Sequence, residues 1–88
     1  MDSHHLPLEP YLSAKVIKRS VNIAGHATSV SLEQPFWDEL VRLAAERNIP
    51  LSQLIEDIDT ARQTNLSSAL RLYVLYHFIS GQKTPSSP

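Results

Sequence analysis

The segment KRSVNIAGHATSVSL, residues 18–32, determines the fold, because it is the only part of the chain with the pattern of a β ribbon. Apolar residues alternate with polar ones in both halves, and this period of two is typical of strands with one buried face. Val21 and Ile23 are odd-numbered, whereas Val30 and Leu32 are even-numbered. Since neighbouring side chains of a strand point to opposite faces, one straight strand cannot bury both pairs. The segment therefore predicts two strands joined by a turn.

Gly25 and His26 are predicted to be the two central residues of that turn. Glycine at the first central position suits a type II′ hairpin. With this turn, Val21 lies opposite Val30, and both apolar sets fall on one side of the hairpin. The residues expected on the opposite, polar side are Ser20, Asn22, Ser29 and Ser31.

The chain is short, and its composition is that of one small domain. It has 88 residues and no cysteine. A core of this size is marginal alone and no disulfide can support it, so we expect oligomerisation to stabilise the fold. The predicted organisation is a flexible arm over residues 1–14, a folded domain over 15–81 and a disordered tail over 82–88.

The charges are unevenly distributed, although the net charge is only −1. Between residues 11 and 32 the chain carries Lys15, Lys18 and Arg19 and no acid. The segment 33–59 carries seven acids against two arginines. The basic segment is either the edge that contacts an anionic partner or an ordinary solvated edge, and the sequence leaves both interpretations open.

Several classes of function lack their sequence signals. No apolar run approaches the ~20 residues that span a bilayer. The N-terminus lacks the pattern of a signal peptide, so we expect a soluble, cytoplasmic protein with no membrane partner. His4 and His5 have no acid or cysteine at ligand spacing, so we predict no metal site. We find no nucleophile elbow and no phosphate-binding glycine loop, and we therefore expect neither a cofactor nor enzymatic activity.

Three helices are predicted after the ribbon. The first begins at Gln34 with Pro35 in its first turn, where the missing N–H is not needed. Its apolar positions cover a wide arc, and it is expected to end with Asn48 in the left-handed region. Ser52 is predicted to cap the second helix, which ends between residues 59 and 62.

The third helix is predicted over residues 66–80, with Asn65 or Ser67 as its cap and Gly81 as its end. It is apolar around most of its circumference, and a helix of this kind lies in a core or an interface. Arg71 is its only formal charge, which we expect to form an ion pair with an acid of the second helix, Asp57 or Asp59.

The order of ribbon, amphipathic helix, Asn-Ile-Pro-Leu-Ser turn and second helix resembles the ribbon-helix-helix family of prokaryotic DNA-binding proteins, of the Arc and MetJ type. The residues that carry the resemblance are Thr28, Ser29, Val30, Ser31, Leu32, Glu33, Phe36, Trp37, Leu40, Ala44, Asn48, Ile49, Leu51, Ser52, Leu54 and Ile55. Residues 18–32 and 65–71 look like a subgroup of uncharacterised small bacterial proteins in that family. The predicted fold is α+β, mainly α, with a β-hairpin or ribbon followed by three helices.

The resemblance implies an intertwined homodimer that binds double-stranded DNA, typically as a transcriptional regulator. A two-stranded ribbon fits the major groove, where the side chains of its outer face read base edges. At the positions that match the family's readers this chain has Ala27, Ser29 and Ser31. The N-terminus of the second helix, with Ser52 and Gln53, is implied to offer backbone N–H groups to a phosphate.

These reader positions depart from the family's pattern of long polar side chains. Ala27 offers only apolar contact, and the serines discriminate little between bases. The added first strand places Lys18, Ser20 and Asn22 on the same face. Asn22 suits adenine, whereas Lys18 suits guanine or a phosphate. Arg19 has the reach and the charge for a phosphate, but it shares the parity of the buried face.

A second interpretation remains open for the same residues. If the first strand covers the reading surface, DNA binding is lost. The protein is then a dimeric protein-interaction module, such as an antitoxin or an adaptor. In both interpretations the third helix is expected to enlarge the dimer interface.

Overall fold

The computed structural model describes residues 12–82. Its elements in chain order are β1 (Val16–Ile23), β2 (His26–Glu33), α2 (Gln34–Glu46), α3 (Leu51–Ala61) and α4 (Leu66–Gln82). Two antiparallel strands followed by three helices confirm the predicted α+β, mainly α, fold. His4 and His5 lie outside the described residues, as do most of the predicted arm and tail.

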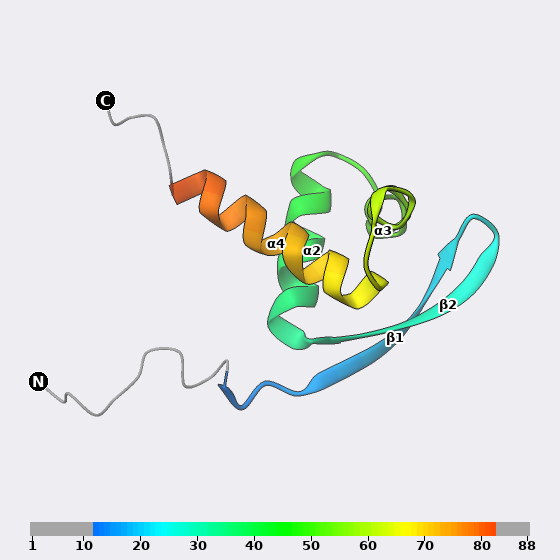
Figure 1. Ribbon diagram of the computed structural model, residues 1–88, viewed down its shortest axis with the longest axis horizontal. Helices are drawn as coiled ribbons and strands as arrows, with labels where there is room; N and C mark the ends of the chain where they lie inside the picture. The colour runs from blue at the N-terminus through cyan, green and yellow to red at the C-terminus, as the bar shows by residue number, and fades with distance from the viewer. Residues whose placement is uncertain (1–11, 83–88) are drawn as a thin grey trace, which may run out of the picture.

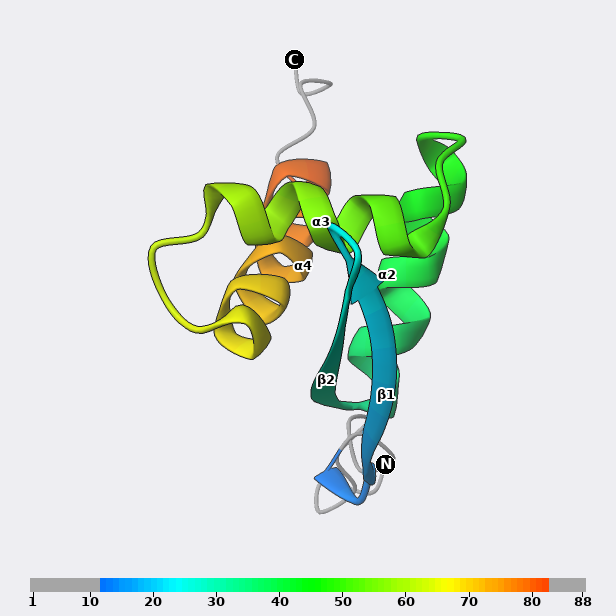
Figure 2. The ribbon, with the colours of Figure 1, turned by 90° about the vertical axis from the view of Figure 1, so that its right-hand side faces the viewer.

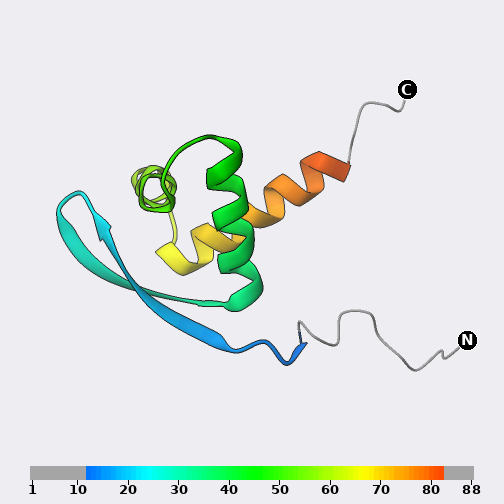
Figure 3. The same ribbon diagram turned by 180° about the vertical axis from the view of Figure 1, so that it is seen from behind.

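The hairpin curves along one side of the helices, and its tip rises beside α3 (Figure 1). Seen from behind, α4 crosses α2, and the C-terminal half of α4 extends away from the hairpin tip (Figure 3). No helix among residues 12–82 combines the length and the apolar character that crossing a membrane requires.

The turn of the hairpin differs from the predicted one by a single residue. Its central residues are Ala24, with φ 51°, and Gly25, with φ 85°. Positive φ at both central positions defines a type I′ turn, whose twist matches that of the flanking strands. Ile23 consequently pairs with His26, and the predicted type II′ turn at Gly25 and His26 is wrong.

The observed register keeps the whole of both strands paired. Val21 lies opposite Thr28 instead of Val30, and Ile17 lies opposite Leu32. The predicted register would have placed Ile17 opposite Gln34, which belongs to α2. Because the register differs by two residues, the two faces of the hairpin keep the side chains that were predicted for them.

The core lies between the inner face of the hairpin and the three helices (Figure 2). Its fully buried large side chains come from β2 and from every helix: Leu32, Trp37, Leu40, Leu54, Ile55 and Leu70. Trp37, which is 0% exposed, also donates a hydrogen bond from Nε1 to the carbonyl oxygen of Ile17, at 3.0 Å. This bond joins α2 to the base of β1 and satisfies the one polar atom of the indole.

The helix ends follow the sequence signals, with two exceptions. Asn48 has a φ of 59°, and the amide of Ile49 bonds the Ala44 carbonyl, which completes the predicted left-handed end of α2. Asn65 caps α4, because its Oδ1 accepts the amide of Ser68 at 2.8 Å. Ser52 does not cap α3.

Pro50 is the N-cap residue of α3, and the helix begins at Leu51, one residue before Ser52. The carbonyl oxygen of Pro50 accepts the amides of Gln53 and Leu54, so Ser52 is already helical. The second exception is Gly81, which lies inside α4 because the helix continues to Gln82.

Candidate nucleic-acid interface

Six of the predicted site residues lie together on the outer face of the hairpin. They form three cross-strand pairs: Lys18 with Ser31, Ser20 with Ser29, and Asn22 with Ala27. Ser31 is half-buried, and the other five residues are exposed. Alternate residues of two paired strands share a face, so the register itself brings these six side chains together. We call this set the outer strip; Figure 2 shows the hairpin lying in front of the helices.

The outer strip offers several kinds of contact to a base edge. The amide of Asn22 can bond adenine at two positions, and the ammonium group of Lys18 can bond guanine or a phosphate. The serine hydroxyls both donate and accept, and the methyl group of Ala27 can contact the methyl group of thymine. A two-stranded ribbon also has the width that the major groove admits. The strip is therefore chemically able to contact DNA, through one long side chain, that of Lys18, and five short ones.

Arg19 lies on the other face of the hairpin. Its guanidinium carbon is 5.1 Å from the centroid of the Trp37 ring, in the position of a cation–π contact. The side chain covers the indole at the base of the hairpin, while Lys18 and Ser20 on either side belong to the outer strip. The structure therefore separates Arg19 from the other predicted ribbon residues.

Ser52 and Gln53 lie in the first turn of α3, and both are exposed. The first amides of a helix have no partner within it, and the helix dipole places partial positive charge there. Gln53 donates from Nε2 to Oδ1 of Asp57, at 2.8 Å, so its side chain is already engaged. A phosphate at this end would meet backbone N–H groups and the Ser52 hydroxyl, with the Asp57 carboxylate one helical turn away.

The positive charge around the outer strip is modest. Lys18 is its only charged member, and Lys15 and Arg19 are close along the chain. Glu33 at the end of β2 is balanced by Arg71, which bonds it at 3.1 Å and 3.5 Å. Hydrogen bonding from the Glu33 backbone, and then from Arg71, lowers the pKa of the Glu33 carboxyl. Each chain can therefore neutralise only a few phosphates, and binding by this surface would depend weakly on salt.

Three contacts that hold the hairpin in place were not predicted. The ion pair of Arg71 joins it to Glu33, not to Asp57 or Asp59 as expected. The hydroxyl of Ser67 donates to the Ser31 carbonyl, at 3.2 Å, and so ties α4 to β2. The third contact is the Trp37 indole bond to β1. Each joins residues at least 20 positions apart, and no local pattern identifies such partners.

No group of three or more metal-ligating side chains occurs within residues 12–82. The arrangement found there is a polar two-stranded ribbon mounted on a helical core, with a helix N-terminus beside it. A two-stranded antiparallel ribbon followed by helices defines a class of protein by its fold.

Comparison with known families identifies that class. The model of the ribbon-helix-helix domain matches residues 16–78, and the chain belongs to this family. Members of the family typically form dimers and bind DNA. A comparison with curated proteins gave no match.

One solved structure is similar over nearly the whole chain. It is that of an uncharacterized protein from Bordetella pertussis Tohama I, which is 30% identical in sequence, with a TM-score of 0.70. The match covers 97% of this chain and 76% of that chain. The likeness therefore includes the added first strand and the third helix, β1 and α4.

Proposed function

We propose that the protein is a sequence-specific double-stranded DNA-binding protein that acts as a homodimer in the cytoplasm, as a transcriptional regulator. The observation that carries the proposal is the outer strip, in which three cross-strand pairs place six side chains, five of them exposed, on one face. Family membership supports the same assignment, since ribbon-helix-helix proteins typically bind DNA and are typically not enzymes.

In the proposed complex the outer strip enters the major groove. Asn22 reads a base through its amide, and Lys18 contacts a phosphate or guanine. The start of α3, through the backbone N–H group and the hydroxyl of Ser52, holds a flanking phosphate and so fixes the register of the ribbon on the duplex. Arg19 stays over Trp37 and supports the hairpin from its inner face.

Selection from a random duplex pool, followed by binding measured by fluorescence anisotropy, tests this proposal. Lys18→Ala is expected to weaken binding on all duplexes and to reduce the salt slope by about 1 for each phosphate that is no longer neutralised. Asn22→Ala is expected to relax the preference at one base position, by roughly 1–3 kcal/mol. Arg42→Ala is the matched control, because it removes an exposed cation of α2 that is paired with Glu39 and Glu46.

The contradicting results are specific. Equal loss of affinity in Lys18→Ala and Arg42→Ala would show that general charge, and not the outer strip, attracts the duplex. Absence of binding at roughly 50 mM salt, by protein that is folded, would refute the proposal.

The second candidate function, a dimeric protein-interaction module such as an antitoxin or adaptor, is favoured by one observation. Five of the six side chains of the outer strip are neutral, and four of them are only serine or alanine. Such a face neutralises few phosphates. Folded dimers that bind no duplex at low salt are the result that would favour this function over DNA binding.

A further inference from the structure

A groove with apolar walls lies between α2 and α4. Its volume is about 550 Å³, and its lining includes Phe36 from α2 and Leu72, Leu75 and Phe78 from α4. The three side chains from α4 are between 46% and 56% exposed. Burial of apolar surface that is gathered around one hollow is favourable, and such a hollow commonly marks a binding surface. We call this hollow the α2–α4 groove.

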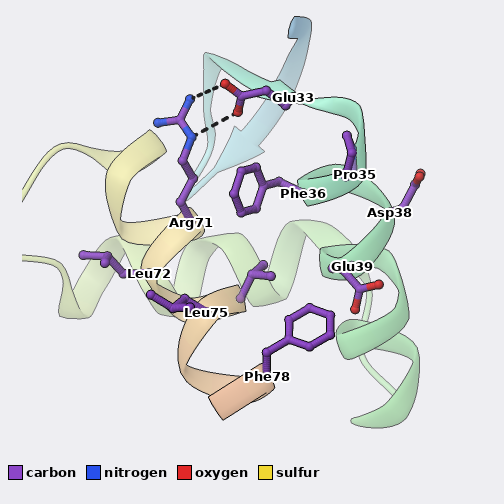
Figure 4. Close-up of a pocket in the computed structure, with 10 residues that line it drawn as sticks. Glu33, Pro35, Phe36, Asp38, Glu39, Arg71, Leu72, Leu75 and Phe78 are labelled. Carbon is purple, nitrogen blue, oxygen red and sulfur yellow. Dashed lines mark hydrogen bonds and ion pairs between the residues drawn. The ribbon is translucent and has the colours of Figure 1, made fainter. Parts of the chain in front are cut away.

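The charged end of the α2–α4 groove is already engaged. Figure 4 shows the groove with Phe78 at one end and the ion pair of Arg71 with Glu33 at the other. The guanidinium carbon of Arg71 also lies 5.8 Å from the centroid of the Phe36 ring. Arg71 is therefore held both by a carboxylate and by an aromatic ring, and an anionic ligand would have to displace Glu33.

The two other acids that line the groove also have partners. Asp38 accepts a hydrogen bond from the side chain of Gln34, at 2.8 Å, and Glu39 is paired with Arg42, at 2.7 Å. Every formal charge of the lining is thus engaged, so the groove does not select a charged ligand. Because the rest of its surface is apolar, the occupant that fits it is an apolar segment.

The N-terminal part of the chain joins the fold beside this groove. The carbonyl oxygen of Lys15 accepts a hydrogen bond from the amide of Gln34, at 3.1 Å. Pro35 and Phe36, the next residues of α2, line the groove. Figures 1 and 2 both place the first described residues, at the blue end of the colour scale, beside the N-terminal end of α2. Residues 1–11, which lie outside the described part, are therefore attached close to the groove.

This attached segment has the composition that an apolar groove requires. Residues 6–11 have the sequence Leu-Pro-Leu-Glu-Pro-Tyr, in which three of the six side chains are large and largely apolar. Leu12, the next residue, is 67% exposed. Proline has a fixed φ, so a segment with two prolines loses less conformational entropy when it becomes ordered. The segment can therefore bind an apolar surface at a low entropic cost.

The segment is also long enough to follow the groove. A chain spans at most about 3.3–3.6 Å per residue, so six residues reach about 20 Å. The part of α4 that lines the groove, residues 71–78, rises by about 10 Å along the helix. Attachment beside the groove gives the segment a local concentration of the order of millimolar. A separate apolar ligand would have to compete with that concentration.

We propose that residues 6–11 bind in the α2–α4 groove of their own chain, with their apolar side chains against Phe36, Leu75 and Phe78. The segment then joins α2 to α4 and covers apolar surface that the core of a small domain leaves exposed. It is held against the fold, in place of the flexible arm that the sequence alone predicts for these residues. The proposal does not depend on DNA binding.

Cross-linking in the full chain tests where the segment lies. The chain has no cysteine, so two introduced thiols are unambiguous. Glu9→Cys keeps the apolar side chains of the segment, and Asp38→Cys places a thiol on an exposed residue of the groove lining. A short bis-maleimide is expected to join this pair within one chain at least about 10-fold faster than Glu9→Cys/Val41→Cys. Val41 is the matched control, because it is exposed on α2 and does not line the groove.

Substitutions in the segment show whether its apolar side chains hold it in place. Adding Leu8→Gln/Tyr11→Gln to the thiols at positions 9 and 38 is expected to lower the cross-linking rate to that of the control. Adding His4→Gln/His5→Gln, the same number of changes at polar residues, should leave the rate unchanged. All four positions precede the described domain, so these substitutions do not alter its core.

Three results would overturn the proposal. Equal rates at positions 38 and 41 would mean that the segment does not prefer the groove. An unchanged rate in Leu8→Gln/Tyr11→Gln would mean that apolar packing does not hold it there. A product with the mass of two chains, in place of one, would assign the groove to the segment of a partner.

Discussion

The outer strip of the hairpin is exposed, and so is a row of side chains on α4, the α4 ridge, but their chemistry is opposite. The ridge consists of Leu72, Leu75, Tyr76 and Ile79. The strip consists of small or polar side chains that water solvates well. The ridge consists of large apolar side chains, and removing about 100 Å² of such surface from water is worth roughly 2.5 kcal/mol. Exposure of the strip to water therefore costs little free energy. Its polar groups can exchange hydrogen bonds with water for hydrogen bonds with base edges. The ridge gains free energy by burial against any apolar surface that fits it.

The two surfaces thus present opposite chemistry to solvent within a small chain. The inner face of the hairpin packs in the core, and its outer face is exposed to solvent. Both strands of the hairpin belong to the same chain. The helix α4 supplies Leu70 and Val74 to the same core and leaves a second apolar face outside. Substitutions at the contacts and at the turn of the hairpin test how firmly it is held against the core.

Trp37→Ala should be the most damaging substitution, because this side chain holds the inner face of the hairpin against α2. The indole is 0% exposed, bonds the Ile17 carbonyl and lies under Arg19. The expected loss is about 3–5 kcal/mol of the free energy of unfolding, measured by urea denaturation. Trp37→Phe, which keeps most of the volume but not the N–H donor, should lose clearly less. Equal losses in the two variants would mean that the indole hydrogen bond, and not packing, anchors the hairpin.

Ala24→Asn should stabilise the hairpin. Ala24 has a φ of 51°, a left-handed conformation that costs a residue with a Cβ about 1–2 kcal/mol. Asparagine adopts this conformation more readily, and Asn-Gly is the preferred pair in type I′ turns. We expect a gain of about 1 kcal/mol in the free energy of unfolding. Ala27→Asn, at an exposed position of β2, is the control and should change it by less than about 0.5 kcal/mol.

A gain at position 27 equal to that at position 24 would show that the effect does not come from the turn. A loss at position 24 would contradict the type I′ geometry. Because Ala24→Asn alters no residue of the outer strip, the specificity of DNA binding should be unchanged by it.

Glu33→Gln should be the mildest of the three substitutions, and its effect should depend on pH. The pKa of Glu33 is lowered in the folded protein from its usual value of 4.5. Its stabilising contribution is therefore present above pH 4.5 and is lost as the pH falls through the lower folded pKa. Both side chains of the Glu33–Arg71 pair are about one third exposed, so solvent screens the interaction. We expect a loss of about 0.5 kcal/mol at about pH 7.

Unfolding free energies of the wild type and of Glu33→Gln, measured from about pH 7 down to about pH 3, check this prediction. The difference between the two proteins should shrink as the pH falls. A difference that is constant over this range would mean that the carboxylate charge does not contribute to folding. Arg71→Leu should remove the same contribution, and adding Glu33→Gln to it should cost little more.

Most of the fold could be predicted from local pattern. The parity of the apolar residues indicated two strands and their faces, and Asn48 and Asn65 marked a helix end and a helix start. The turn could not be placed in the same way. Turns at residues 24–25 and 25–26 bury the same face, so parity does not distinguish between them. The end of β2 distinguishes between the two turns, because α2 begins at Gln34. The turn at residues 24–25 allows β1 to pair along the whole of β2.

The residues of the candidate site could be predicted, but the contacts that hold the hairpin in place could not. Alternation alone identifies Lys18, Ser20 and Asn22 as neighbours of the β2 serines. The ion pair of Arg71 with Glu33, 38 residues away, depends on how α4 crosses the end of β2. Ser52 was expected as a cap because serine commonly caps helices, yet α3 begins one residue earlier, at the carbonyl of Pro50.

An amide chemical-shift titration of the intact protein with its selected duplex can show whether the ribbon is the surface that recognises DNA. We expect shift changes at residues 18–22 and 27–31 and at the start of α3, with the amides of the α4 ridge unchanged. Shift changes concentrated on the α4 ridge, with the outer strip unaffected by the duplex, would contradict the assignment of the outer strip as the DNA-binding surface.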